Sequence, residues 1–288
     1  AEGSVQEVMD LAGVAHLSTI KSSVPFVNFF DGFRTSHEIQ KIEVMEQDDL
    51  APLLDREALA AFRKRALTPE APVARGMAEN GDVFFQHREA CNQHYNAVPE
   101  IVENYMAEVS KICGREYHLF NYYGAPDAER VIIAMGSVTQ AIEEAIDSLV
   151  AKGEKVGLVA VHLYRPFSAK HFLAAVPATA KRIAVLDRTK EPGANGEPLY
   201  LDVKECFYGK ENAPVIVGGR YGLASKDTTP AQILAVYENL ALPEPKDHFT
   251  LGIVDDVTFT SLPLMPEVAL GDPSTFEAKF FGLGADGT

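Results

Sequence analysis

The chain has 288 residues, of which 47% are hydrophobic and 23% charged, and its 26 basic and 41 acidic side chains leave a net charge of −15. This apolar content excludes an intrinsically disordered protein. No basic cluster stands out from the acidic background, so we expect no nucleic-acid partner. The longest apolar stretches, such as residues 156–161, are far shorter than the ~18 residues that a membrane span needs. We therefore expect a soluble protein without membrane contact.

The three cysteines, Cys91, Cys113 and Cys206, are too far apart in the sequence for the paired spacing of zinc or iron–sulfur ligands. Their odd number and the absence of a secretory signal favour free thiols in a reducing cytoplasm over a disulfide framework. The chain starts without Met and stops in a glycine-rich stretch at residues 284–288, so we expect a piece of a longer polypeptide.

The first 45 residues have the pattern of the end of an α/β domain. An apolar stripe from Val5 to Ala12 predicts a helix, and the apolar run at residues 24–30 predicts a buried parallel strand. The Thr35-x-x-Glu38 spacing is that of a capping box and predicts the start of another helix.

Residues 46–119 lack any strand–helix alternation. Charged helical stretches at residues 55–65 and 98–112 are joined by a proline-rich link around Pro69 and Pro72. We interpret this region as a helical connector that packs against a partner domain or subunit.

Alternation of strands and helices dominates residues 120–246. Strands are predicted at residues 131–135, 156–163, 182–187 and 215–217, each followed by a helical pattern. This order predicts an α/β fold with a parallel doubly wound sheet, covered by helices on both faces. After a linker at residues 243–246, short predicted strands at 250–254 and 276–281 indicate that a third domain starts near residue 249.

Three loops carry candidate chemistry. Residues 282–287 form a G-x-G-x-x-G pattern after a predicted strand, which suits a pyrophosphate, although a flexible glycine turn is the alternative. Arg188 and Lys190 follow the third strand, where they could meet an anion, a local acid or a neighbouring domain. Residues 29–38 concentrate aromatic and titratable side chains, among which His37 reads as structural. The sequence contains no nucleophile elbow, P-loop or zinc motif.

Four stretches resemble the pyruvate:ferredoxin (flavodoxin) oxidoreductase family, and the similarity extends over essentially the whole chain. They are residues 24–38 (VPFVNFFDGFRTSHE), 187–203 (DRTKEPGANGEPLYLDV), 218–230 (GGRYGLASKDTTP) and 279–288 (KFFGLGADGT). The resemblance implies the end of a thiamine-binding-type domain at 1–45, a transketolase C-terminal-like domain at 120–246, and the start of a coenzyme A-associated third domain at 249–288.

The family oxidatively decarboxylates pyruvate with thiamine diphosphate and Mg, passes electrons through [4Fe-4S] clusters to ferredoxin or flavodoxin, and transfers the acetyl group to coenzyme A. The resemblance implies coenzyme A contacts at five residues only: Gly284, Ala285, Asp286, Gly287 and Thr288. It implies no catalytic residue and no metal ligand within the chain. We therefore expect an inactive segment that holds no thiamine, cluster or metal by itself and acts as a scaffold in a homodimeric cytoplasmic enzyme.

Two other interpretations stay open at this point. The chain could be a separately encoded subunit of a 2-oxoacid oxidoreductase, assembled with partners that carry the cofactors. It could also be a non-catalytic α/β interaction module, because a fold does not determine a function.

Overall fold

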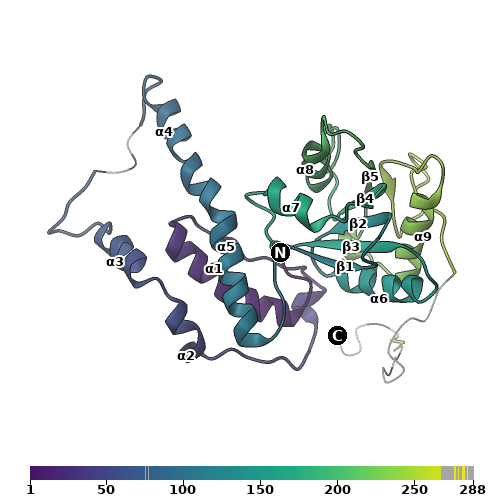
Figure 1. Cartoon of the computed structure of the whole chain (residues 1–288), viewed down its shortest axis with the longest axis horizontal. Helices are drawn as coiled ribbons and strands as arrows, with labels where there is room; N and C mark the ends of the chain where they lie inside the picture. Colours follow the sequence, from purple (N-terminus) through teal and green to yellow (C-terminus); the bar gives the residue numbers. More distant parts are fainter. Residues whose placement is uncertain are drawn as a thin grey trace.

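A computed structural model describes residues 1–74, 76, 78–266, 276, 278, 281, 282 and 284. A group of helices, α1 to α5, lies beside an α/β part that contains the sheet and α6 to α9 (Figure 1). One apolar core is continuous between them, because buried residues of α1 and α5 cluster with residues of the sheet. No helix in the described ranges combines the length and apolar character that a membrane crossing requires.

The sheet has six strands in the order β1-β3-β2-β4-β5-β6. Every pair of neighbours is parallel except β1 and β3. The predicted mostly parallel α/β fold is therefore confirmed, with an antiparallel edge strand that the sequence pattern did not indicate. The strands are β1 (Phe120–Gly124), β2 (Arg130–Ala134), β3 (Val156–Val161), β4 (Arg182–Asp187), β5 (Val215–Arg220) and β6 (Phe249–Thr250).

Both faces of the sheet are apolar because every residue from 131 to 134 in β2 and from 183 to 186 in β4 is aliphatic. In β2, Val131 and Ile133 belong to the cluster that includes α7 (Ala169–Ala175) and α8 (Pro198–Phe207). Ile132 and Ala134 belong to the opposite cluster, with α6 (Val138–Val150) and α9 (Pro230–Ala241). All four side chains are fully buried, as expected for a strand covered on both faces.

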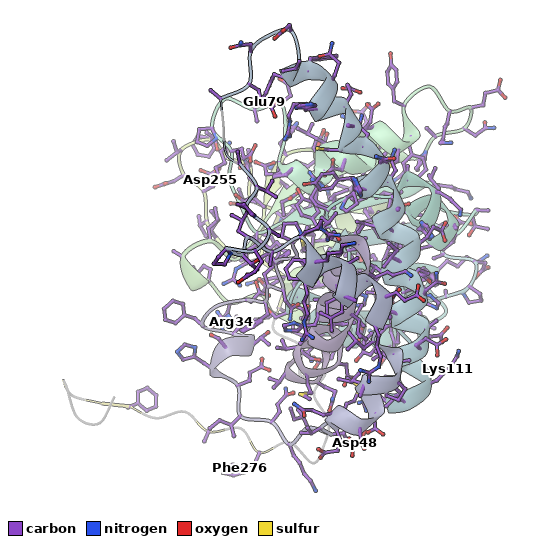
Figure 2. All side chains as sticks on the ribbon, turned by 90° about the vertical axis from the view of Figure 1, so that its left-hand side faces the viewer. Arg34, Asp48, Glu79, Lys111, Asp255 and Phe276 are labelled. Carbon is purple, nitrogen blue, oxygen red and sulfur yellow. The ribbon has the colours of Figure 1, made fainter. Side chains whose placement is uncertain are left out.

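The helical part is built on the pairing of two long helices, α1 (Val5–Ser22) and α5 (Asn92–Cys113). The shorter helices α3 (Arg56–Lys64) and α4 (Phe84–Ala90) contain no buried residue, and α2 (Gln47–Leu50) is a single turn. Figure 2 shows this side of the molecule covered with charged side chains, among them the exposed Asp48, Glu79 and Lys111.

A buried carboxylate ties α1 to the segment after α5. Asp10 is fully buried and accepts hydrogen bonds from Arg115 Nε at 2.7 Å and Arg115 Nη2 at 3.2 Å. It also accepts one from the Tyr117 hydroxyl at 2.7 Å and one from Gln6 at 3.1 Å. Burial raises the pKa of Tyr117, and its hydrogen bond to Asp10 adds to the effect. The arrangement satisfies a buried charge on every side and so fixes the α1–α5 pair.

Two predictions for the first 45 residues are wrong. Residues 24–30 form no strand: their backbone makes a single bridge, from Phe30 to Glu2, and Val27 is 83% exposed. These residues pair with neither edge strand of the sheet, β1 or β6, and residues 24–29 line a cavity beside the loop after β3 instead. The predicted capping box at Thr35 is instead a 3₁₀ turn, Thr35–His37, without a side-chain cap.

Candidate functional site at the carboxyl edge of the sheet

The strand order of the sheet reverses direction between β2 and β4. The chain runs from β2 to β3 on one side, then crosses back to β4 and continues outward to β5. In open α/β sheets, ligands bind outside the carboxyl ends of the strands at such a reversal. Here the position is bordered by Gly136 after β2, Arg188 after β4 and Gly222 after β5.

A carboxylate of the same chain occupies this position. Arg188 Nη1 donates a hydrogen bond to Asp31 Oδ1 at 2.6 Å, and the Ser137 backbone N–H donates to Asp31 Oδ2 at 2.5 Å. Arg188 Nε also donates to the Gly222 carbonyl at 3.1 Å, which holds the guanidinium in place. The Asp31 side chain is 15% exposed and that of Arg188 22%. The pair is therefore largely withdrawn from solvent and lies at the backbone N–H of Ser137, the N-cap residue of α6.

The approach of Asp31 depends on a glycine. Gly136 has a φ of +82°, and a Cβ atom added to it would lie 2.6 Å from Asp31 Oδ2. Ser137 is the N-cap residue of α6 and makes no side-chain cap hydrogen bond. The carboxylate of Asp31, 106 residues earlier, accepts the backbone N–H of this N-cap residue. An anion at the positive end of a helix is the favourable arrangement.

A second buried carboxylate, Asp187, lies at the end of β4. It accepts hydrogen bonds from the backbone N–H groups of Leu199 at 3.0 Å and Tyr200 at 3.1 Å, at the start of α8. Burial raises the pKa of Asp187 to about 6, although these two hydrogen bonds act in the opposite direction. Asp187 thus caps α8, which assigns it a structural role.

Two small cavities flank the Asp31–Arg188 pair. One, of about 260 Å³, is lined mainly by apolar and aromatic residues, including Phe30, Met135 and Tyr221. The other, of about 230 Å³, has a mixed lining of cationic, acidic and polar side chains. At its edge, Arg34 forms an exposed ion pair with Asp227 at 2.5 Å. The segment that carries Asp31 thus contacts the sheet domain through a second ion pair.

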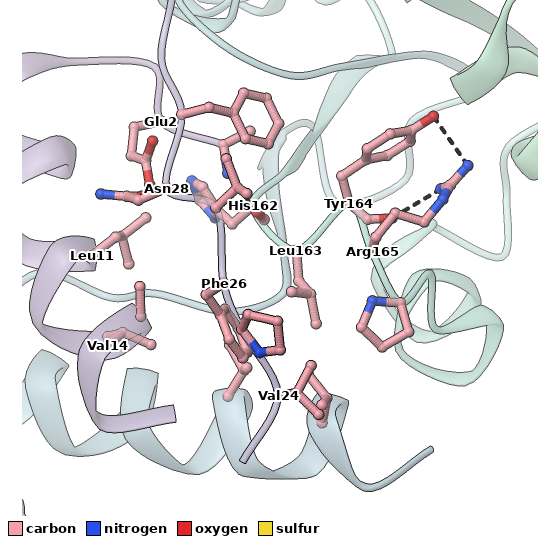
Figure 3. Close-up of a pocket in the computed structure, with 18 of the residues that line it drawn as sticks. Glu2, Leu11, Val14, Val24, Phe26, Asn28, His162, Leu163, Tyr164 and Arg165 are labelled. Atoms are coloured by element: carbon pink, nitrogen blue, oxygen red, sulfur yellow. Dashed lines mark hydrogen bonds between the residues drawn. The ribbon is translucent and has the colours of Figure 1, made fainter. Parts of the chain in front are cut away.

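A further cavity, of about 540 Å³, lies between α1, α5, residues 24–29 and the loop after β3. Its walls are mostly apolar, with Leu11, Val14 and Phe26 toward one side and Leu163 toward the other (Figure 3). His162 lies at its polar end, where Nδ1 faces the His118 carbonyl at 3.0 Å. A lining of this kind suits an apolar occupant.

The structure places the predicted site residues in very different surroundings. Arg188 pairs with an acid of residues 1–45, whereas Lys190 is exposed. In the glycine loop, Gly284 is exposed, with a φ of +122°. The other four predicted coenzyme A contacts, Ala285, Asp286, Gly287 and Thr288, lie outside the described residues. Within the described part of the chain, no group of three or more His, Cys, Asp or Glu side chains could hold a metal ion.

Sequence reasoning did not single out Asp31, which forms the centre of this site. Its position between two aromatic residues and Gly32, directly after an apolar run, was the available signal. His37, which the sequence indicated as structural, stacks on Phe33 with ring centroids 5.1 Å apart.

Comparison with protein families divides the chain into two matched parts. Residues 1–107 match the family model for pyruvate flavodoxin/ferredoxin oxidoreductase, thiamine diphosphate-binding. Residues 128–233 match core domain II of pyruvate:ferredoxin oxidoreductase. The chain corresponds to a segment of the pyruvate:ferredoxin/flavodoxin oxidoreductases. Asp31 lies in the first matched part of this oxidoreductase segment and Arg188 in the second, so their ion pair joins the two.

Individual relatives are similar over the full chain. The segment is 62% identical to a pyruvate-flavodoxin oxidoreductase of Enterobacter agglomerans and 58% identical to a pyruvate:ferredoxin oxidoreductase of Moorella thermoacetica. In both alignments 100% of this chain is covered, and the chain spans about a quarter of the relative's length (25%). A pyruvate dehydrogenase [NADP(+)] of Cryptosporidium parvum is 51% identical, with 15% of its length covered.

A solved structure of a 2-oxoglutarate:ferredoxin oxidoreductase from Magnetococcus marinus, with 2-oxoglutarate, coenzyme A and succinyl-CoA bound, was also matched. It is 18% identical, with a TM-score of 0.37, and the match covers 61% of this chain and 28% of that one.

Proposed function

We propose that this chain is a scaffold segment of an enzyme that converts pyruvate and coenzyme A to acetyl-CoA and CO₂, with the electrons passed to ferredoxin or flavodoxin. The relatives that carry these names are up to 62% identical over the whole chain. The observation that carries the scaffold role is the Asp31–Arg188 pair, which connects the part matched to a thiamine diphosphate-binding domain with the part matched to core domain II.

We propose the same domain boundaries that the sequence pattern and the family resemblance indicate. Residues 1–45 end the thiamine-binding-type domain, 46–119 form the helical connector, 120–246 the transketolase C-terminal-like domain, and 249–288 begin the coenzyme A-associated domain. Gly284, Ala285, Asp286, Gly287 and Thr288 contribute the edge of the coenzyme A site. Three free cysteines support a cytoplasmic location.

The chemistry of decarboxylation belongs to the thiamine cofactor, which stabilises the carbanion formed when CO₂ leaves. We place the Mg and the iron–sulfur clusters in parts of the polypeptide outside this segment, since the segment spans about a quarter (25%) of the length of its relative. This segment's own contribution is positional: it holds the thiamine-type part against the sheet. We expect the complete enzyme to be a homodimer.

The natural protein that contains this sequence, purified without oxygen, tests the proposal. We expect it to reduce a viologen dye only when both pyruvate and coenzyme A are present, with acetyl-CoA and CO₂ formed in equal amounts. Omission of coenzyme A and replacement of pyruvate by 2-oxoglutarate are the matched controls. Reduction that depends on 2-oxoglutarate, or no pyruvate-dependent reduction, would contradict the assignment.

A further inference from the structure

The reversal point of the sheet has the features of an anion-binding site. It combines a guanidinium, a helix N-terminus and a glycine that leaves room for an oxygen atom, all at the carboxyl ends of β2 and β4. A carboxylate is bound there in the structure, and it comes from Asp31, which is 157 residues from Arg188 in the sequence.

We propose that this edge of the sheet is a carboxylate-binding site whose resident ligand is the Asp31 side chain. The segment around Asp31 thereby occupies the crevice that a doubly wound sheet ordinarily offers to a soluble ligand. With Asp31 removed, the same site binds a small monocarboxylate such as formate or acetate. This inference concerns how the chain is held together and does not depend on the catalysed reaction.

The geometry shows why the Asp31–Arg188 pair, and not the Arg34–Asp227 pair, holds residues 29–38 against the sheet. The Asp31–Arg188 pair is largely buried, and each Asp31 oxygen accepts a hydrogen bond from a separate donor. The Arg34–Asp227 pair extends from the same segment, but Asp227 is 76% exposed. Charge-assisted hydrogen bonds withdrawn from water are strong, whereas exposed ion pairs contribute little.

The backbone hydrogen bonds within residues 29–38 provide a way to measure whether Asp31 is bound to the sheet. Ser36 N–H donates to the Asp31 carbonyl at 3.2 Å, and His37 N–H donates to the Arg34 carbonyl at 2.8 Å. These hydrogen bonds close the turn that presents Asp31 to the sheet. If Asp31 anchors the turn, the amides of residues 29–38 lose protection against hydrogen exchange when the carboxylate is removed.

The test is hydrogen exchange on the natural full-length protein with Asp31→Gly. We expect exchange of residues 29–38 to accelerate about 10- to 100-fold, from the loss of a charged hydrogen-bond pair. Formate, which is not attached to the turn, should instead bind the vacated site and raise the thermal unfolding midpoint of this variant, whereas formamide, or chloride at equal ionic strength, should not. Asp227→Gly, which removes the exposed pair of the same segment, is the matched control and should change exchange by less than about 5-fold.

The double variant Asp31→Gly/Arg188→Gln removes the guanidinium and should show no response to formate. If Asp31→Gly does not fold, Asp31→Asn provides the measurement, because its neutral amide keeps the shape and loses the charge; we then expect about 10-fold faster exchange. The inference is wrong if Asp31 variants exchange like Asp227→Gly, or if formate acts equally with and without Arg188. Either result would also remove the support for the scaffold role, but it leaves the pyruvate-oxidation assay unaffected, so the proposed reaction and this inference fail separately.

Discussion

Removal of the buried carboxylate of Asp10 should loosen the α1–α5 pair. Asp10→Ala leaves Arg115, whose side chain is only 30% exposed, and the Tyr117 hydroxyl without their shared acceptor. Breaking a buried ion pair by removing one partner costs about 3–5 kcal/mol. Arg115 cannot relieve the loss by deprotonation, because a guanidinium keeps its charge in proteins even without an acidic partner.

Hydrogen exchange of the α1 amides in the full-length protein measures this opening free energy directly. Glu43→Ala is the matched control, because Glu43 binds the same guanidinium at 2.6 Å but is 79% exposed. We expect its effect to stay below about 1 kcal/mol. In the double variant Asp10→Ala/Arg115→Ala, the losses of opening free energy caused by the two single substitutions should not add, since both remove the same interaction. A loss below about 1 kcal/mol in Asp10→Ala would refute the reasoning.

Three further variants test the sheet. Burial raises the pKa of Asp187 to about 6, about 2 units above its ordinary value, so the folded state binds the proton more tightly. The free energy of unfolding should therefore fall by about 2 kcal/mol as the pH rises from 4 to 6, and thermal unfolding of Asp187→Asn should lack this slope. Gly219→Ala would place a Cβ 2.2 Å from the buried ring of Phe249 on β6 and should lower the free energy of unfolding in urea by about 1–3 kcal/mol. Gly81→Ala, whose Cβ would meet no atom within 4 Å, is the control and should be near neutral. Tyr237→Phe removes a buried hydrogen bond to the Gly157 carbonyl and should cost about 1 kcal/mol in the same assay; an unchanged midpoint would contradict it.

The features that were predicted correctly from the sequence are determined by short-range patterns. The strand predicted at residues 182–187 is β4 with the same bounds, because an apolar run between a turn and a charged loop has few alternatives. The Thr229-Pro230-x-Gln232 sequence has the spacing of a capping box with proline in the first helical turn, and these side chains form the capping box of α9. Each of these signals is complete within a few neighbouring residues.

The features that were missed depend on contacts between distant parts of the chain. Residues 24–30 have the composition of a strand, but pairing depends on an edge that the local sequence does not specify. Arg188 was selected as a candidate anion ligand, yet its partner could not be inferred, because nothing near Asp31 indicates which cation it meets. The antiparallel direction of β1 is likewise set by where β3 lies and not by its own residues.

The composition of the natural protein that contains this sequence decides whether these 288 residues, of 31.4 kDa, form a scaffold segment of a larger pyruvate-oxidising enzyme. Mass spectrometry together with thiamine diphosphate and iron analysis on the purified protein should give a polypeptide about four times longer than the chain. It should hold about one thiamine diphosphate, with iron in multiples of four. A 31.4-kDa polypeptide that oxidises pyruvate unaided, or a larger one without bound thiamine diphosphate and iron, would contradict the account.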